Sequence, residues 1–558
     1  MPQNLETEKL KLEIERLKKE LKKKKKYGLV WDSEREPEEV VEMCKEKLPV
    51  LKEVKGKEII TDKNKPVNLL IEGDNYHALS VLNYTHKGKI DVIYIDPPYN
   101  TGNRDFKYND RWIDVEDGFR HSKWLNFMEK RLNLAKDLLK SSGAIFISID
   151  ENEVAQLKLL CDKIFDEKNF ESIISWRRRS NQPNDKAKMI AKVSEFILVY
   201  AKNSASLKEN KFFNTLSLSE KRIQAYSNPD NDPRGAWSTT PWCASRGQGG
   251  TKYEIITPTK KRYNETWLGM RETFNKLLED KRIVFPRNGN GKPRKKVFLK
   301  EREAEGQSAI NFWFGANYGD NLVASSQLND IFGGDRVFDN PKPTNLIKTI
   351  LELKTDKNDL IVDFFAGSGT TGHAVLELNK QDDGNRKFIL CTNDEELDHN
   401  SDSKKHKICT GICYPRIEKA IKGYKNQKKE KVVGLGGNLK YFRTDFVDYK
   451  DATDKSKIRL TEEAIEMLCV KEGTFEEVEN RVGFKIFKNL ERHTGIIFDQ
   501  QTIKEFKKSI SNIKGKFSVY IFSLGDDSFD DEFEDMKSKV KLSPIPEAIL
   551  KVYRKIFK

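Results

Sequence analysis

The residues best suited to chemistry form the tetrapeptide Asp96-Pro97-Pro98-Tyr99, which follows an apolar run at 90–95. A polar loop at the end of a buried strand lies where open α/β sheets bind their ligands. The Asp96 carboxylate and the Pro97 carbonyl can each accept one N–H of an exocyclic amine on an aromatic ring. This would draw the nitrogen toward a pyramidal geometry and free its lone pair. The tetrapeptide therefore suits chemistry at an aromatic amine.

The loop at 96–99 is also stiff and carries an aromatic ring. Two consecutive prolines fix their own φ at about −65° and restrict the residue before each of them. Tyr99 offers a ring on which a base extruded from a duplex can stack, and Phe106 and Tyr108 are candidates for further stacking surfaces. The alternative is a plain Pro-Pro turn, in which Asp96 is a turn acceptor and Tyr99 a partly buried aromatic residue.

A second candidate site is the glycine-rich turn in 360–372, between an apolar run and a helix-like stretch. Gly367, Gly369 and Gly372 fit the Gly-x-Gly-x-x-Gly spacing of a dinucleotide site, because glycine lets the backbone approach a ligand closely. The lysine that a nucleoside-triphosphate loop requires is absent at its spacing. The ligand is therefore not a triphosphate held in that way.

Residues around this turn narrow the choice of ligand. Phe365 stands just ahead of the glycines, and the acidic pair Asp394-Glu395 follows the next apolar run, where a carboxylate can take ribose hydroxyls. An adenosine with a methionyl tail fits this pattern as well as NAD does. A tight packing turn without a ligand is a further alternative.

The elements that must position both loops are short apolar runs separated by amphipathic stretches. This alternation predicts an α/β open sheet with helices on its faces. The expected strands are 67–71, 90–95, 144–149, 196–200, 360–365 and 388–391, and the expected helices are 124–139 and 374–378.

Changes in composition divide the chain into five expected parts. An N-terminal charged arm, with a helix at 5–26, precedes the two halves of the sheet, a region rich in Gly, Trp, Arg and Lys is inserted between those halves, and a small α+β domain containing a strand at 519–522 follows. The expected bounds are 1–65, 66–204, 205–330, 331–428 and 429–558.

The bulk composition sets broad limits. Lys and Arg number 101 against 87 Asp and Glu, and the resulting charge of +14 favours a polyanionic partner such as nucleic acid, or else a solvated charged surface. Seven scattered cysteines and no secretory segment predict a reducing, cytoplasmic compartment. No apolar run reaches the roughly 18 residues of a membrane span, so we expect a soluble protein.

One cluster of histidines and cysteines contains residue types that can bind a metal. His399, His406, Cys409 and Cys413 lie close together in the sequence, but their spacing lacks a tight Cys-x-x-Cys pair. We expect no metal there and instead predict a surface pair of histidines beside two thiols packed near the start of a helix.

The order of the two loops, Asp-Pro-Pro-Tyr at 96–99 before Phe-Ala-Gly-Ser-Gly at 365–369, resembles the β class of DNA amino-methyltransferases, in which the catalytic motif comes first. Most of 27–450 resembles, more closely, the modification subunit of type III restriction-modification systems. The further stretches that carry this resemblance are Gly73-Asp74-Asn75, Asn340-Pro-Lys342-Pro343, Tyr414-Pro-Arg416 and Asn438-Leu-Lys-Tyr-Phe-Arg443.

The resemblance implies a Rossmann-like, permuted, open twisted sheet that uses S-adenosylmethionine. It implies that the loop at 96–99 handles the target adenine, since Asp at position 96 favours adenine N6 over cytosine N4. Lys342 and Pro343 would lie at a helix start that closes over the methionyl part of the cofactor, and Glu395, in competition with Asp394, would meet the ribose. The remaining implied cofactor-binding residues are Asp363, Phe365, Ala366, Gly367, Ser368 and Gly369.

The resemblance also implies that the inserted region recognises the target sequence in double-stranded DNA. It implies a homodimer that works with a separate helicase-nuclease subunit. A solitary adenine methylase, a cytosine-N4 methyltransferase and a non-catalytic DNA-binding module remain alternatives. The candidate DNA-binding residues are Arg234, Arg246, Arg287, Arg294, Lys295 and Lys296.

Overall fold

The computed structural model describes residues 31, 36–181, 190–209, 213–218, 220–397, 406–450, 453–525, 527 and 529–557. The expected helix at 5–26 and His399 lie outside these residues. The chain divides into two compact units. The larger unit comprises Met1–Phe212 and Asn311–Lys558, and the smaller unit, called here the inserted unit, comprises Phe213–Ile310.

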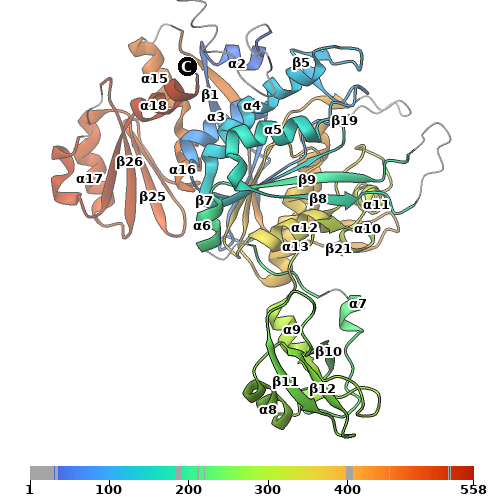
Figure 1. Ribbon diagram of the computed structural model, residues 1–558. Coiled ribbons are helices and arrows are strands. Elements are labelled where there is room, and N and C mark those ends of the chain that lie inside the picture. The colour runs from blue at the N-terminus through green and yellow to red at the C-terminus, as the bar shows by residue number, and fades with distance from the viewer. Residues whose placement is uncertain are drawn as a thin grey trace, which may run out of the picture. The chain divides into compact units, whose positions relative to one another are not determined.

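The larger unit is built on an eleven-stranded sheet whose central strands are parallel (Figure 1). β2 (Ile59–Ile60) pairs with β22 beside the main path. The path runs β1 (Lys47–Glu53), β22 (Asn438–Asp448), β3 (Val67–Glu72), β17 (Lys387–Thr392), β16 (Leu360–Asp363), β4 (Ile90–Ile95), β7 (Leu139–Ile149), β9 (Ser194–Ala201), β8 (Phe170–Arg177) and β15 (Phe312–Trp313).

Helices cover both faces of this sheet, as Figure 1 shows, and β4 is buried along its whole length. A strand covered on both faces needs apolar side chains on both, which is why these strands are continuous apolar runs. One face carries α3 (Asn75–Thr85), α4 (Arg120–Leu138) and α5 (Val154–Phe165), and the other carries α12 (Thr344–Lys354) and α13 (Thr370–Asp382). The predicted α/β class is confirmed, as are the strands and helices predicted within it.

The strand order reverses between β4 and β16. From β16 the chain passes through α13 to β17 on one side, and from β4 it passes through α4 to β7 on the other. β4 and β16 are themselves parallel neighbours, with Val92 opposite Ile361 and Ile93 opposite Val362. Such a switch point opens a crevice at the carboxyl ends of the two strands, where α/β proteins bind ligands.

The C-terminal part of the larger unit is an α+β arrangement, as predicted. Its sheet is β23 (Glu476–Asn480), β24 (Phe484–Lys488), β25 (Arg492–Ile497), β26 (Lys516–Phe522) and β27 (Val540–Ile545). The Tyr553 hydroxyl donates a hydrogen bond to the Pro49 carbonyl of β1, so this part is tied to the edge of the main sheet. Its helices are α15 (Asp454–Glu463), α16 (Ile465–Glu472), α17 (Ile503–Ser511) and α18 (Glu547–Ile556).

The inserted unit has a small core of its own around Trp242, Trp267 and Phe274. Its three-stranded sheet is β10 (Trp237–Pro241), β14 (Arg294–Phe298) and β13 (Ile283–Val284), beside a hairpin of β11 (Thr251–Ile256) and β12 (Arg262–Trp267). Its helices are α7 (Glu220–Ile223), α8 (Arg271–Glu279) and α9 (Leu299–Glu305).

Shorter elements complete the description. They are α2 (Glu39–Met43), β5 (Lys107–Tyr108), β6 (Arg111–Trp112), α6 (Ser204–Glu209), α10 (Gly315–Tyr318), α11 (Asn321–Ile331), β18 (Glu396–Leu397), β19 (His406–Lys407), a π-helix (Ile408–Cys413), α14 (Tyr414–Lys422), β20 (Gly423–Lys425) and β21 (Lys431–Val433), with 3₁₀ turns at Glu167–Asn169, Gln500–Thr502 and Asp531–Met536. None of the helices among the described residues combines the length and hydropathy that a membrane crossing demands.

Three predicted boundaries need correction, because strand pairing places them elsewhere. The insertion was expected at 205–330, but β15 pairs with β8, so 311–330 belongs to the larger unit. β22 pairs with β3 and therefore belongs to the main sheet and not to the C-terminal part, which was expected from 429. β1, expected in the N-terminal arm, pairs with β22 at the sheet edge.

Candidate active site

The tetrapeptide 96–99 leaves the end of β4 and is held from two sides. The Trp124 indole N–H donates to the Pro98 carbonyl at 2.8 Å. The next residue, Asn100, is fully buried at φ 56° and donates to Glu153 at 2.6 Å. No hydrogen bond within the described part of the chain uses the Pro97 carbonyl. The loop is therefore anchored, while the carbonyl that the sequence assigned to an amine is left open.

Asp96 belongs to a cluster of charges that the sequence did not reveal. Its Oδ1 accepts a hydrogen bond from the Tyr99 hydroxyl at 2.9 Å, and its Oδ2 accepts one from the Lys342 ammonium at 2.9 Å. The same two donors approach Glu195, the Tyr99 hydroxyl at 3.0 Å and the Lys342 Nζ at 3.4 Å from Oε2. Arg178 Nε lies 3.3 Å from the other Glu195 oxygen.

The protonation states in this cluster follow from burial and charge. Burial pulls the pKa of Lys342 down, but the carboxylates of Asp96 and Glu195 outweigh it and hold that pKa above its ordinary value. Burial and the same two carboxylates hold the pKa of Tyr99 well above its ordinary range. Lys342 is therefore a cation and Tyr99 a neutral hydroxyl over the physiological range.

The glycine turn leaves the end of β16 and is braced by the buried carboxyl of Asp363. Its two oxygens accept from the Thr371 hydroxyl at 2.5 Å and from the Phe365 amide at 3.0 Å. Burial raises the pKa of Asp363 to about 7. Gly367 and Gly369 have φ of 49° and 79°, in the left-handed region that favours glycine. The turn leads into α13, where free backbone N–H groups are available to a ligand.

The buried Arg416 supports the glycine turn through hydrogen bonds. The Arg416 guanidinium donates to the Ser368 hydroxyl at 3.0 Å and to the Thr370 hydroxyl at 2.7 Å. Both cysteines ahead of its helix, Cys409 and Cys413, are buried thiols, as predicted. Arg416 thus fixes the shape of the glycine turn and does not itself meet a ligand at the surface.

Lys342 links the two loops. Its backbone carbonyl accepts a hydrogen bond from the Thr370 hydroxyl of the glycine turn at 3.2 Å, while its ammonium holds Asp96. It directly precedes Pro343, which caps α12. The resemblance implies a place for Lys342 over the cofactor's methionyl part, whereas in the structure its ammonium binds the Asp96 carboxylate of the loop at 96–99.

The two acidic residues after β17, Asp394 and Glu395, have different partners. Both Asp394 oxygens accept hydrogen bonds from the Thr410 hydroxyl, and Oδ1 also accepts the Thr410 amide. Glu395 is more exposed and forms an ion pair with Lys107 at 3.2 Å. Glu395 is thus the freer of the two carboxylates for a ribose.

Two residues of the site, Glu195 and Arg178, were not predicted from the sequence, and two predicted stacking residues do not lie at its surface. Glu195 begins an apolar strand and Arg178 follows another, so neither carried a pattern. Phe106 and Tyr108 were candidate stacking surfaces, but they are only 1% and 2% exposed and pack in the core. They are therefore unavailable to a base.

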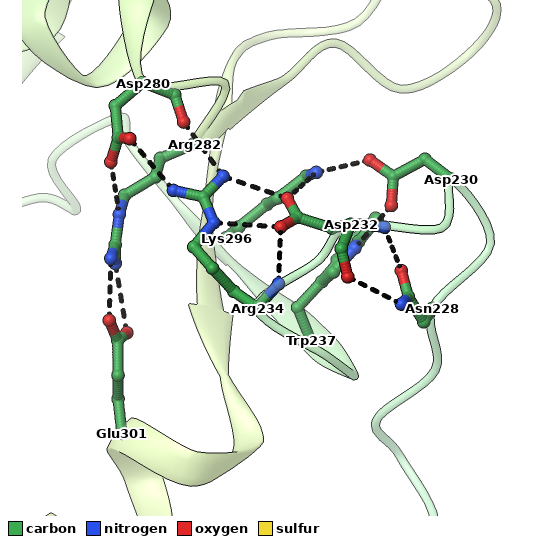
Figure 2. Close-up of polar contacts among 9 residues, drawn as sticks. All are labelled: Asn228, Asp230, Asp232, Arg234, Trp237, Asp280, Arg282, Lys296 and Glu301. Carbon is green, nitrogen blue, oxygen red and sulfur yellow. Dashed lines mark hydrogen bonds and ion pairs between the residues drawn. The ribbon is translucent and has the colours of Figure 1, made fainter.

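The six cationic candidates of the inserted unit fall into two groups: those with side-chain partners inside the unit, and those that form no ion pair with another described residue. Figure 2 shows two members of the first group, Arg234 and Lys296. Arg234 pairs with Asp232 at 2.9 Å and Asp280 at 3.0 Å, and Lys296, 3% exposed, pairs with Asp230 and Asp232. Arg294 donates to the Thr239 side chain and carbonyl. These three side chains thus already form ion pairs or hydrogen bonds within the inserted unit.

The other three candidates are Arg246, Arg287 and Lys295. Arg246 and Arg287 are exposed and Lys295 is half-buried, and none of the three forms an ion pair with another described residue. The expectation of DNA contacts is therefore retained for these three and not for Lys296, whose burial excludes contact with a phosphate.

The fold and site define an α/β protein with a charged loop at 96–99 and a glycine turn at one switch point. Residues 90–400 match the DNA methylase family of N6 and N4 enzymes, and the chain belongs to that family. It is 38% identical over 363 residues to the type III restriction-modification enzyme StyLTI Mod subunit of Salmonella typhimurium, covering 61% of this chain and 54% of that protein.

Two further relatives are a second Mod subunit and a type II methyltransferase. The EcoP15I Mod subunit of Escherichia coli is 32% identical over 61% of this chain and 60% of its own length. The type II methyltransferase M.KpnI of Klebsiella pneumoniae is 33% identical over 57% of this chain and 78% of its own. The alignments thus span little more than half the length of the two Mod subunits.

Proposed function

We propose that this protein transfers a methyl group from S-adenosylmethionine to the N6 amine of adenine in double-stranded DNA, acting on a base flipped out of the duplex. The observation that carries the proposal is Lys342. This one residue joins the loop that bears Asp96 to the glycine turn, at neighbouring ends of two paired parallel strands. A methyl acceptor on one loop and a methyl donor on the other would then face each other across a single crevice.

The residues around the glycine turn fit an adenosine with a sulfonium-bearing tail. Phe365 is half-buried and offers an aromatic ring, Glu395 offers a partly exposed carboxylate for ribose hydroxyls, and α13 offers backbone N–H groups at its start. Asp363 would act by bracing the turn. When bound, the cofactor would supply a methyl group that is already activated, so that the protein needs only to align and polarise the amine.

The catalytic loop would perform that polarisation. Asp96 and the open Pro97 carbonyl would accept the two N–H groups of the target amine, which localises the nitrogen lone pair toward the methyl donor. Lys342 lies 5.0 Å from the centroid of the Tyr99 ring, over one face. The flipped base would stack on the other face, which offsets part of the stacking lost from the duplex.

The larger assembly is proposed from the relatives. Two of them are named Mod subunits of type III enzymes, so we propose that this chain modifies and recognises DNA as a homodimer beside a separate helicase-nuclease subunit. The inserted unit would recognise the target sequence, with Arg246, Arg287 and Lys295 reaching phosphates or guanine edges. A solitary adenine methylase would use the same site.

Product analysis tests the proposal. DNA exposed to the purified protein and S-adenosylmethionine should gain N6-methyladenine at one short sequence motif, detected by nucleoside mass spectrometry and by sequencing of modified bases. Asp96→Ala should lose this product by about a thousandfold while still binding DNA and cofactor. N4-methylcytosine as the product would replace the adenine assignment. Absence of any product in both proteins, with DNA binding retained, would favour a non-catalytic binding module.

A further inference from the structure

Glu195 is a buried carboxylate that the proposed chemistry does not yet use. It lies near the start of β9, and β9 runs antiparallel to β7, with Phe196 opposite Ile149 at the end of β7. The start of β9 therefore lies at the same sheet edge as the carboxyl ends of the parallel strands. Glu195 is 5% exposed there. A carboxylate held out of water needs partners of opposite charge or hydrogen-bond donors.

Its partners are the same two groups that hold Asp96. The Tyr99 hydroxyl lies almost midway between the two carboxylates, 2.9 Å from Asp96 and 3.0 Å from Glu195. The Lys342 ammonium lies 2.9 Å from Asp96 and 3.4 Å from Glu195. Glu195 has in addition Arg178, on its other oxygen. Two carboxylates and two cations thus balance within one cluster, in which Glu195 and Lys342 are buried and Asp96 and Arg178 are half-buried.

The single hydrogen of the Tyr99 hydroxyl limits how many hydrogen bonds this cluster can form at one time. A tyrosine hydroxyl carries one hydrogen, so Tyr99 donates to one of the two carboxylates at a time. In this arrangement both oxygens of Asp96 already have a donor, one from Tyr99 and one from Lys342. An incoming amine that donates to Asp96 Oδ1 would share this oxygen with the Tyr99 hydroxyl, and two donors on one oxygen weaken each other's hydrogen bonds. A second acceptor almost equally close to the hydroxyl can relieve this sharing.

We propose that Glu195 is a positioning residue that takes over the hydrogen bond of the Tyr99 hydroxyl when the target amine binds Asp96. Tyr99 keeps its proton, and only the acceptor of its hydrogen bond changes. Lys342 and Arg178 balance both carboxylates throughout, so the exchange leaves no charge uncompensated. The inference rests on the proposed function, because it concerns how Asp96 is made available to an exocyclic amine.

The test is Glu195→Gln, with Asp162→Asn as the matched control. Asp162 likewise accepts a tyrosine hydroxyl and a lysine ammonium, from Tyr200 at 2.8 Å and Lys158 at 2.7 Å, but it lies on α5 outside the proposed site. Glu195→Gln should lower the single-turnover rate of adenine methylation by about tenfold or more and leave the cofactor dissociation constant within about twofold of wild type. Asp162→Asn should leave both unchanged.

A double-mutant cycle with Tyr99→Phe separates exchange from simple support. If Glu195 acts through the Tyr99 hydroxyl, the loss caused by Glu195→Gln should shrink by about fivefold or more once that hydroxyl is gone. An undiminished loss in the Tyr99→Phe background would overturn the inference. So would a Glu195→Gln rate equal to that of Asp162→Asn, or weakened cofactor binding, which would indicate a structural role. Wild-type protein without adenine methylation would instead overturn the proposed function itself.

Discussion

Each of the two units contains a buried lysine placed between two carboxylates and over an aromatic ring. In the larger unit Lys342 pairs with Asp96 and Glu195 and lies 5.0 Å from the Tyr99 ring centroid. In the inserted unit Lys296 pairs with Asp230 and Asp232 and lies 4.7 Å from the Trp237 ring centroid. Their side chains are 8% and 4% exposed.

The two lysines differ in where their partners come from. Asp230, Asp232 and Trp237 belong to one short stretch, so Lys296 fastens a local loop onto β14 (Figure 2). Asp96 and Glu195 lie far apart in the sequence and meet only at the switch point of the main sheet. Residue type and burial therefore do not distinguish a functional cluster from a stabilising one; the position at the carboxyl ends of the parallel strands does.

The largest effect should come from Lys342→Met. Asp96 and Glu195 would then lose their shared cation, and the repulsion between the two carboxylates would move Asp96 away from the position in which it can accept the target amine. Methylation should fall by about a hundredfold or more. Single-turnover rates measure this.

Lys158→Met is the control, because Lys158 also pairs with a carboxylate, Asp162, and lies over the Phe170 ring. A loss from Lys342→Met that is no larger than the control's would contradict the comparison.

A smaller effect, on stability alone, should follow from Lys296→Met. Removing this buried cation leaves the buried Asp232 paired with Arg234 but not with Lys296, which should lower the unfolding midpoint of the inserted unit by about 4 °C or more. Differential scanning fluorimetry and trypsin cleavage within 213–310 report this, and cofactor affinity should not change.

The exposed pair Lys292–Glu265 provides the matched control, since Lys292→Met should shift the midpoint by about 1 °C or less. Equal shifts in the two variants would show that burial of Lys296 contributes nothing.

The smallest effect should come from the exposed arginines of the inserted unit. Arg246→Ala combined with Arg287→Ala should weaken DNA binding about equally for all sequences and reduce the slope of log K against log salt by about 1 to 2. Arg302→Ala removes a charge already paired with Glu305 and is the control. Fluorescence anisotropy across a salt series tests this, and an unchanged slope in the double variant would exclude both arginines from the phosphate contacts.

Much of the larger unit could be predicted from the sequence because its features are local. The apolar run before Asp96 and the run before the glycine turn are strands covered on both faces, and such strands are recognisable as continuous apolar segments. The positive φ of Gly367 and Gly369 is likewise a requirement of the turn itself. Both loops can therefore be identified from the sequence alone, without the pairing of the strands.

The features that were missed depend on pairing between distant segments. Glu195 gave no pattern because a single acidic residue beside an apolar strand is common, and only the antiparallel pairing of β9 with β7 brings it to Tyr99. Lys296 stood in a basic stretch that indicated DNA contact, but the fold buries it against two aspartates. The boundary of the insertion was wrong because β15 is two residues long, too short to recognise alone.

The sequence by itself determined the central apolar strands, the two loops and their order along the chain, because backbone restriction by proline and glycine and the burial of apolar runs act over a few residues. The tertiary structure alone decided which charges stand together. The Tyr99 hydroxyl and the Lys342 ammonium, from two distant segments, each come within about 3.5 Å of the Glu195 carboxylate, from a third segment, only after the sheet has set its strand order. Electrostatic energy depends on that separation in space and not on separation along the chain.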